Sequence, residues 1–158
     1  MSASTRTTEV SVETRLRRLR WYNVVMGAIH AISGVVILAL ANDFAIPVTA
    51  SFLEGQPGGP EPRTIRTLFE IRFAWGVAAF VFLSALAHWL IASPGIYEWY
   101  CKNLRRDRNY ARWIEYSLSS SVMVVLIAML TGITDVAALG AIFGVNAAMI
   151  LFGLLMEH

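Results

Sequence analysis

The chain has 158 residues, of which 56% are hydrophobic and 15% charged, and its mean hydropathy is +0.56. A soluble domain of this length is less apolar, so the composition excludes an ordinary water-soluble globular protein and favours one that faces lipid. The formal net charge is only +2 at pH 7, and the single cysteine, Cys101, excludes an intrachain disulfide.

The chain opens with a polar leader rich in Ser, Thr and Arg. We predict that residues 1–20 form a basic cytoplasmic arm, either disordered or amphipathic, because Glu9 and Glu13 argue against an organelle transit peptide. The apolar stretch behind the leader is too long for the core of a signal peptide, so we expect it to stay in the mature protein.

Four apolar stretches follow, at about residues 21–41, 73–92, 109–131 and 136–156. A helix rises about 1.5 Å per residue, so roughly 20 residues cross the ~30 Å hydrocarbon core of a bilayer. Backbone polar groups must be paired inside lipid, which makes these stretches helices. The sequence therefore predicts an all-α membrane protein with four transmembrane helices, in a membrane domain that covers residues 21–158.

The connections between these helices differ in length and charge. Residues 42–72 contain several prolines and glycines, and we predict an extracellular loop there with a possible small β-hairpin. Residues 93–108 form a basic loop. The last connection, residues 131–135, is short, so the third and fourth helices should be antiparallel neighbours.

Basic side chains predict the orientation, because Lys and Arg near helix ends are retained in the cytoplasm. Ten of them lie in the leader or near the basic loop: Arg6, Arg15, Arg17, Arg18, Arg20, Lys102, Arg105, Arg106, Arg108 and Arg112. The other side has three: Arg63, Arg66 and Arg72. We therefore predict a multi-pass protein of the cell membrane with a cytoplasmic N-terminus, whose basic surface contacts membrane lipids with anionic headgroups.

Ionisable residues inside predicted spans are costly and often functional. There are three of them, His30, His88 and Glu115, and all fall in the cytoplasmic half of their helices. Ser84 lies four residues before His88, and Ser119 lies four residues after Glu115, so each pair shares a helix face. A carboxylate that faces two imidazoles across a small wet cavity would suit a cation or a mobile proton.

Structural explanations compete with a functional one for each of these residues. Glu115 could pair with Arg112, one turn earlier on the same helix. His30 and His88 could each hydrogen-bond to a neighbouring helix and simply hold the bundle together.

The sequence also contains small residues at the spacing of helix contacts, and it lacks the common catalytic and binding motifs. The pairs Gly27 with Ala31 and Gly140 with Gly144 have the spacing of helix packing faces. No phosphate-binding glycine loop, metal-ligand spacing or nucleophile motif is present, so we do not predict an enzyme or a nucleic-acid-binding protein.

One segment resembles a known family. Residues 112–123, RWIEYSLSSSVM, look like the third-helix signature of heliorhodopsins. Further similarities lie at residues 40–45 (LANDFA), 141–147 (AIFGVNA) and 150–153 (ILFG), and weaker ones at His30 and at residues 84–88 (SALAH). The resemblance covers residues from about 20 to 157.

The resemblance implies a seven-helix photoreceptor that carries retinal as its cofactor and has a cytoplasmic N-terminus. By resemblance, Glu115 is the counterion of the protonated retinal Schiff base. The remaining site residues match two regions of the family: the cytoplasmic polar cavity (His30, His88, Ser84) and the retinal pocket (Ser119, Ser120, Met123, Asn146). The first extracellular loop would help to form a homodimer, and the signalling partner is unknown.

The retinal lysine of heliorhodopsins lies on their seventh helix, and the 158 residues contain four predicted helices. Their one lysine, Lys102, is in the basic loop, so this stretch alone is not expected to attach retinal covalently. It is either the front portion of a longer chain or a shortened relative without chromophore, acting as a membrane scaffold or interaction protein. A light-gated proton or ion conductor is a third alternative. Sensing is favoured over pumping, because Leu126 and not a second carboxylate stands eleven residues beyond Glu115.

Overall fold

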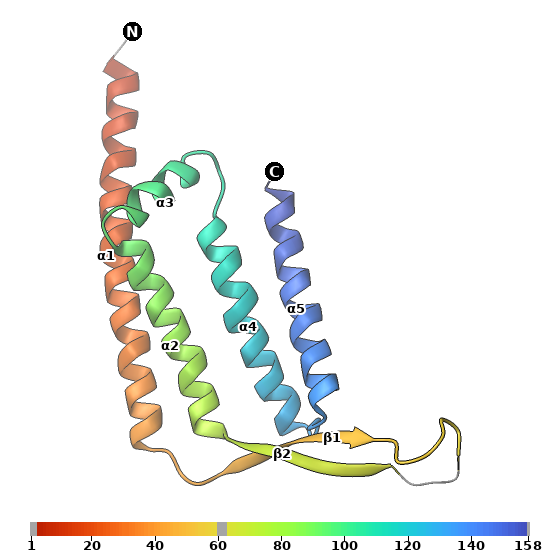
Figure 1. The fold of residues 1–158 in the computed structure, drawn as a ribbon. Coiled ribbons are helices and arrows are strands. Elements are labelled where there is room, and N and C mark those ends of the chain that lie inside the picture. The colour runs from red at the N-terminus through yellow and green to blue at the C-terminus, as the bar shows by residue number, and fades with distance from the viewer. Residues whose placement is uncertain (1–2, 60–62, 158) are drawn as a thin grey trace.

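The computed structural model describes residues 3–59 and 63–157. Within them the elements are α1 (Ala3–Ala39), β1 (Ala45–Phe52), β2 (Thr64–Arg72), α2 (Phe73–Ala92), α3 (Ile96–Leu104), α4 (Tyr110–Leu130) and α5 (Val136–Met156). The four long helices stand beside one another, with α3 across one end and the two strands at the other (Figure 1). We call these the α3 end and the hairpin end.

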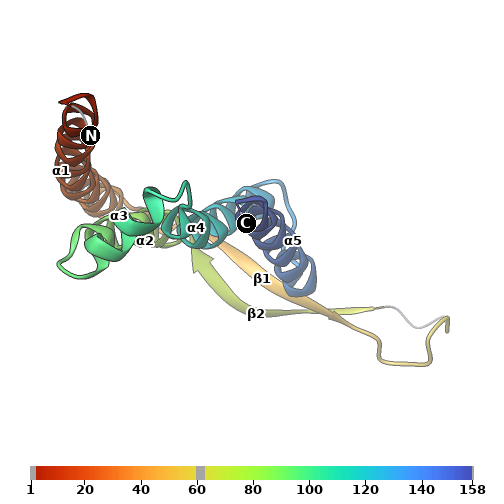
Figure 2. The same ribbon diagram turned by 90° about the horizontal axis from the view of Figure 1, so that it is seen from above.

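The four long helices are apolar enough to cross a membrane. The candidate spans are Val12–Ala39, Phe73–Ala92, Tyr110–Leu130 and Val136–Met156. They form one open row in the order α1, α2, α4, α5, so their outward faces are left to lipid (Figure 2). The predicted helical membrane protein is confirmed, whereas its orientation in the membrane stays a prediction.

Helix α1 is longer than the sequence predicted. It begins at Ala3 and not near residue 21, so the described part of the leader is a continuation of the first span. Its sequence from residue 3 to residue 20 contains no glycine or proline that would end a helix. The 37 residues of α1 reach about 55 Å, well beyond the hydrocarbon core, and α1 projects past α3 in Figure 1.

A short helix, α3, lies within the predicted basic loop. Gly95, with φ of 85°, precedes it in a backbone conformation that other residues rarely adopt. Tyr97 donates a hydrogen bond from its hydroxyl to the backbone oxygen of Leu16, which ties α3 to α1. Burial raises the pKa of Tyr97 to about 12 and also raises the pKa of Tyr100.

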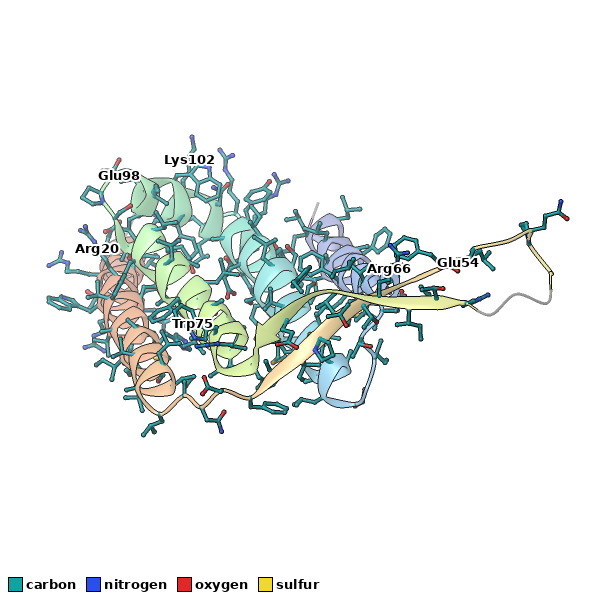
Figure 3. All side chains as sticks on the ribbon, turned by 60° about the horizontal axis from the view of Figure 1, so that its bottom comes forward. Arg20, Glu54, Arg66, Trp75, Glu98 and Lys102 are labelled. Carbon is teal, nitrogen blue, oxygen red and sulfur yellow. The ribbon has the colours of Figure 1, made fainter. Side chains whose placement is uncertain are left out.

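The loop between α1 and α2 forms the predicted β-hairpin. β1 and β2 are antiparallel, with a register shift between Val48 and Thr49. Ile46 and Val48 are buried together with Met129 and Leu139, so β1 packs onto the hairpin ends of α4 and α5. The outer part of the hairpin projects away from the bundle, where Figure 3 shows Arg66 and Glu54.

The hairpin also holds the turn between α4 and α5. The backbone N–H of Thr49 donates to the backbone oxygen of Thr134 over 2.8 Å, and the Ser51 hydroxyl donates to Asp135 over 3.1 Å. Asp135 caps α5 by accepting from the backbone N–H groups of Ala137 and Ala138. Hydrogen bonds from Ala138 and then Ser51 lower the pKa of Asp135. α4 and α5 are antiparallel neighbours, as predicted.

Candidate functional site

The carboxylate of Glu115 lies between α4 and α2. Asn109 caps α4 by accepting from the backbone N–H of Arg112, and this places Glu115 in the second turn of the helix. The hydroxyl of Ser84, a buried residue of α2, donates to Glu115 Oε1 over 2.8 Å. The structure therefore joins two residues that the sequence placed in separate helices.

Arg112 does not pair with Glu115 in the described part of the chain. Its guanidinium lies over the ring of Trp113, 5.1 Å from the centroid, and the ion pairs among described residues do not include Glu115. The alternative in which Glu115 is neutralised by Arg112 is therefore wrong for this structure. A carboxylate inside a span with no basic partner is costly, and it is the kind of group that function preserves.

The two histidines meet on the α1 and α2 side of the site. Their rings are stacked, with centroids 5.5 Å apart and an angle of 10° between the planes. His88 Nδ1 lies 2.8 Å from the side-chain oxygen of Asn23, so Nδ1 carries the donated proton. The Asn23 amide donates in turn to the backbone oxygen of Leu19, and the residue is only 7% exposed.

Asn23 is a member of the site that the sequence analysis missed. It is a buried amide in an apolar span, seven residues before His30 and therefore on the same helix face. Together, these two features could have identified Asn23 as a site residue from the sequence.

An open cavity of about 190 Å³ lies between Asn23, His88 and Glu115. Its polar lining comes from α1, α2, α3, α4 and the cap of α4: Asn23, His88, Tyr100, Asn109, Arg112, Glu115 and Tyr116. The volume is enough for several waters, each of which occupies about 30 Å³ in the liquid. A second groove, lined mainly by leucine, isoleucine and alanine side chains, also reaches Glu115. Glu115 therefore stands between a polar space and an apolar one.

The four residues that the resemblance matched to a retinal pocket do not form one cluster in the structure. Ser119 is buried one turn beyond Glu115 on the same face of α4. The Asn146 amide of α5 donates to Ser120 Oγ over 2.9 Å and to Ser121 Oγ over 3.0 Å, so this trio joins α4 to α5. Met123 is 40% exposed on α4. Ser119 and Met123, four and eight residues beyond Glu115, share its face of α4.

The side chains of the site can hold charges and protons. No group of three or more His, Cys, Asp or Glu residues in the described ranges could hold a metal ion. A carboxylate, an imidazole and an amide around one cavity, with a second imidazole stacked on the first, can bind water, hold a cation or move a proton.

Comparison with known proteins adds a family. The family model described as Heliorhodopsin matches residues 19–158, which include every site residue described above. No curated protein matches the chain.

Proposed function

The chain belongs to the heliorhodopsin family, and on that premise we propose that its four spans form the counterion side of a retinal pocket used for light sensing. The observation that carries this proposal is Glu115. Its carboxylate lies inside a span, accepts a hydrogen bond from Ser84 and forms no ion pair with a described basic side chain. Such a carboxylate needs a positive charge beside it.

The residues fit retinal on one side of its attachment point. Retinal, when linked to a lysine amine, supplies visible absorption and a positive charge at the linkage. Glu115 would balance that charge, and the Ser84 hydroxyl would hold the carboxylate in place. The one lysine of the 158 residues, Lys102, is exposed on α3, so the attachment amine has to come from another helix.

The histidines provide a place for a proton on the other side of the cavity. Because His88 donates from Nδ1 to Asn23, its Nε2 carries the lone pair of the neutral ring. His30 stacks on that ring and can share the charge when a proton arrives. We propose that these two side chains store a proton within the protein.

Proton storage is favoured over proton transport, because apolar side chains lie between the site and the hairpin end. Leu126 is 6% exposed and lies against Gly76 of α2, and Met129, farther along α4, is 2% exposed. These side chains offer no group that could pass a proton onward from Glu115. A sensory role therefore suits α4 better than pumping does.

Complementation tests the proposal. The chain should be coexpressed with a heliorhodopsin fragment that supplies the remaining helices and the lysine, and all-trans retinal should be added. We expect a visible band that hydroxylamine bleaches, and no such band from either polypeptide alone. A complex that assembles but stays colourless would favour the chromophore-free scaffold.

We also propose that the chain forms a homodimer through the hairpin. Ile65, Leu68 and Phe69 of β2 are 70%, 48% and 53% exposed, and such apolar side chains on a projecting strand favour association. Phe69→Lys should weaken the dimer at least ~10-fold, measured by analytical ultracentrifugation in detergent. The neighbouring Glu70→Lys is the matched control. A monomeric unmodified chain would contradict the proposal.

A further inference from the structure

Helix α1 carries a basic segment just beyond the level at which α2 ends. Arg20 Nε donates to the backbone oxygen of Ala92, the last residue of α2, over 2.9 Å, and its guanidinium lies 5.4 Å from the centre of the Tyr97 ring. Arg20 thus lies level with the end of α2, beside α3 (Figure 3). Arg17 lies about 5 Å farther along the helix, and we infer that this level, beyond the end of α2, is that of the lipid headgroups.

A cavity of about 230 Å³ lies on this segment, and Thr14, Arg17, Arg18 and Trp21 line it. Their spacing of three, four and seven residues places all four on one face of α1. Among the described residues, no carboxylate lines the cavity. Trp21 is 69% exposed, which is typical of a tryptophan at a membrane interface.

The neighbouring cavity between α1 and α3 differs in charge. It shares Arg17, but its lining includes the carboxylates of Glu13 and Glu98, and Glu13 already pairs with Arg105. Protein groups therefore offset much of its positive charge. The positive charge of the cavity at Arg17 and Arg18 remains for a ligand.

The helix face continues into the span as an apolar surface. Val25 and Ile32 follow Trp21 on this face, and they are 49% and 63% exposed. A molecule with a phosphate at the arginines would therefore have an apolar path for a chain below it. This arrangement fits a phospholipid and gives no advantage to a soluble phosphate.

We propose that Thr14, Arg17, Arg18 and Trp21 bind the phosphate headgroup of an anionic phospholipid in the leaflet at the α3 end. Arginine presents two parallel N–H groups to phosphate oxygens, and basic residues next to a span attract anionic lipid. The acyl chain lies along Val25 and Ile32. This site is separate from the Glu115 cavity and does not require retinal.

Lipid retention tests the site. The chain is placed in nanodiscs that contain phosphatidylcholine and phosphatidylglycerol, released, and examined by native mass spectrometry. We expect preferential retention of phosphatidylglycerol. Arg17→Gln with Arg18→Gln should reduce that retention roughly 30-fold, because each charge-assisted hydrogen bond lost from the phosphate weakens binding at least about fivefold.

Matched variants separate a site from general electrostatics. Lys102→Gln with Arg106→Gln removes the same charge at the same end and should leave retention unchanged, and an equal loss would overturn the proposal. Arg17→Lys with Arg18→Lys keeps the charge and loses only the paired N–H groups, so it should retain phosphatidylglycerol better than the glutamine variant does; loss as complete as in the glutamine variant would overturn the proposal. Displacement of the lipid by inorganic phosphate would also overturn it, since the site would then take any phosphate.

Discussion

Glu115→Gln is expected to move the visible band of the retinal-loaded complex to longer wavelength by tens of nanometres. Glutamine has nearly the same shape and can still accept the hydrogen bond from Ser84, but it removes the negative charge. Two unit charges 4 Å apart interact by about 4 kcal/mol at an effective dielectric constant of about 20, which is a small fraction of a visible transition energy but enough to move the band by tens of nanometres. Absorption spectra of the two complexes, prepared with the same retinal, measure the shift.

Two further variants make this result specific. Glu98→Gln changes an exposed carboxylate on α3 and should leave the band in place. Ser84→Ala keeps the charge of Glu115 and should shift the band less than Glu115→Gln does. If the Glu115→Gln band coincides with that of the unmodified complex, Glu115 is not the counterion.

Gly34→Ala should destabilise the bundle by about 1–3 kcal/mol, the usual cost of adding volume to a packed contact. A Cβ at this position of α1 would lie 2.7 Å from two ring atoms of Phe82 on α2. The ring or the helix has to move, which weakens the α1–α2 contact. Thermal unfolding in detergent, followed by circular dichroism, measures the loss.

Gly140→Ala on α5 provides the opposite control. Nothing lies within 4 Å of a Cβ at Gly140, so alanine should gain helix propensity, up to about 1 kcal/mol, without a clash. The two substitutions are chemically identical and should differ in sign. A shared sign would contradict the packing described for α1 and α2.

Most of the fold follows from hydropathy and turn residues. The predicted helices at residues 73–92, 109–131 and 136–156 agree with α2, α4 and α5 to within one residue at each end. Hydropathy failed at the start of α1, because it marks only the part of a helix that lies in lipid. It also missed α3, which has nine residues of mixed polarity and packs through tertiary contacts.

Within the site, spacing along one helix was predictable and pairing between helices was not. The sequence placed Ser84 and His88 on one face, but the Ser84 bond to Glu115 and the stack of His30 on His88 depend on how the helices pack. Of the two helix packing faces predicted from small residues, one agrees with the structure and one does not. A Cβ on Gly27 would clash with the Trp89 ring, as a packing face requires, whereas Gly140 and Gly144 face open space in the described chain.

The contact between the hairpin and the α4–α5 turn constrains the order of assembly during synthesis. Thr49 and Thr134 bond to each other across 85 residues of sequence. A ribosome completes β1 and β2 before residue 134 exists, so the backbone N–H of Thr49 has no partner until the α4–α5 turn has been synthesised. That N–H is paired only after α4 has crossed and the turn has emerged. Docking of the hairpin onto this turn therefore has to follow the synthesis and insertion of α4.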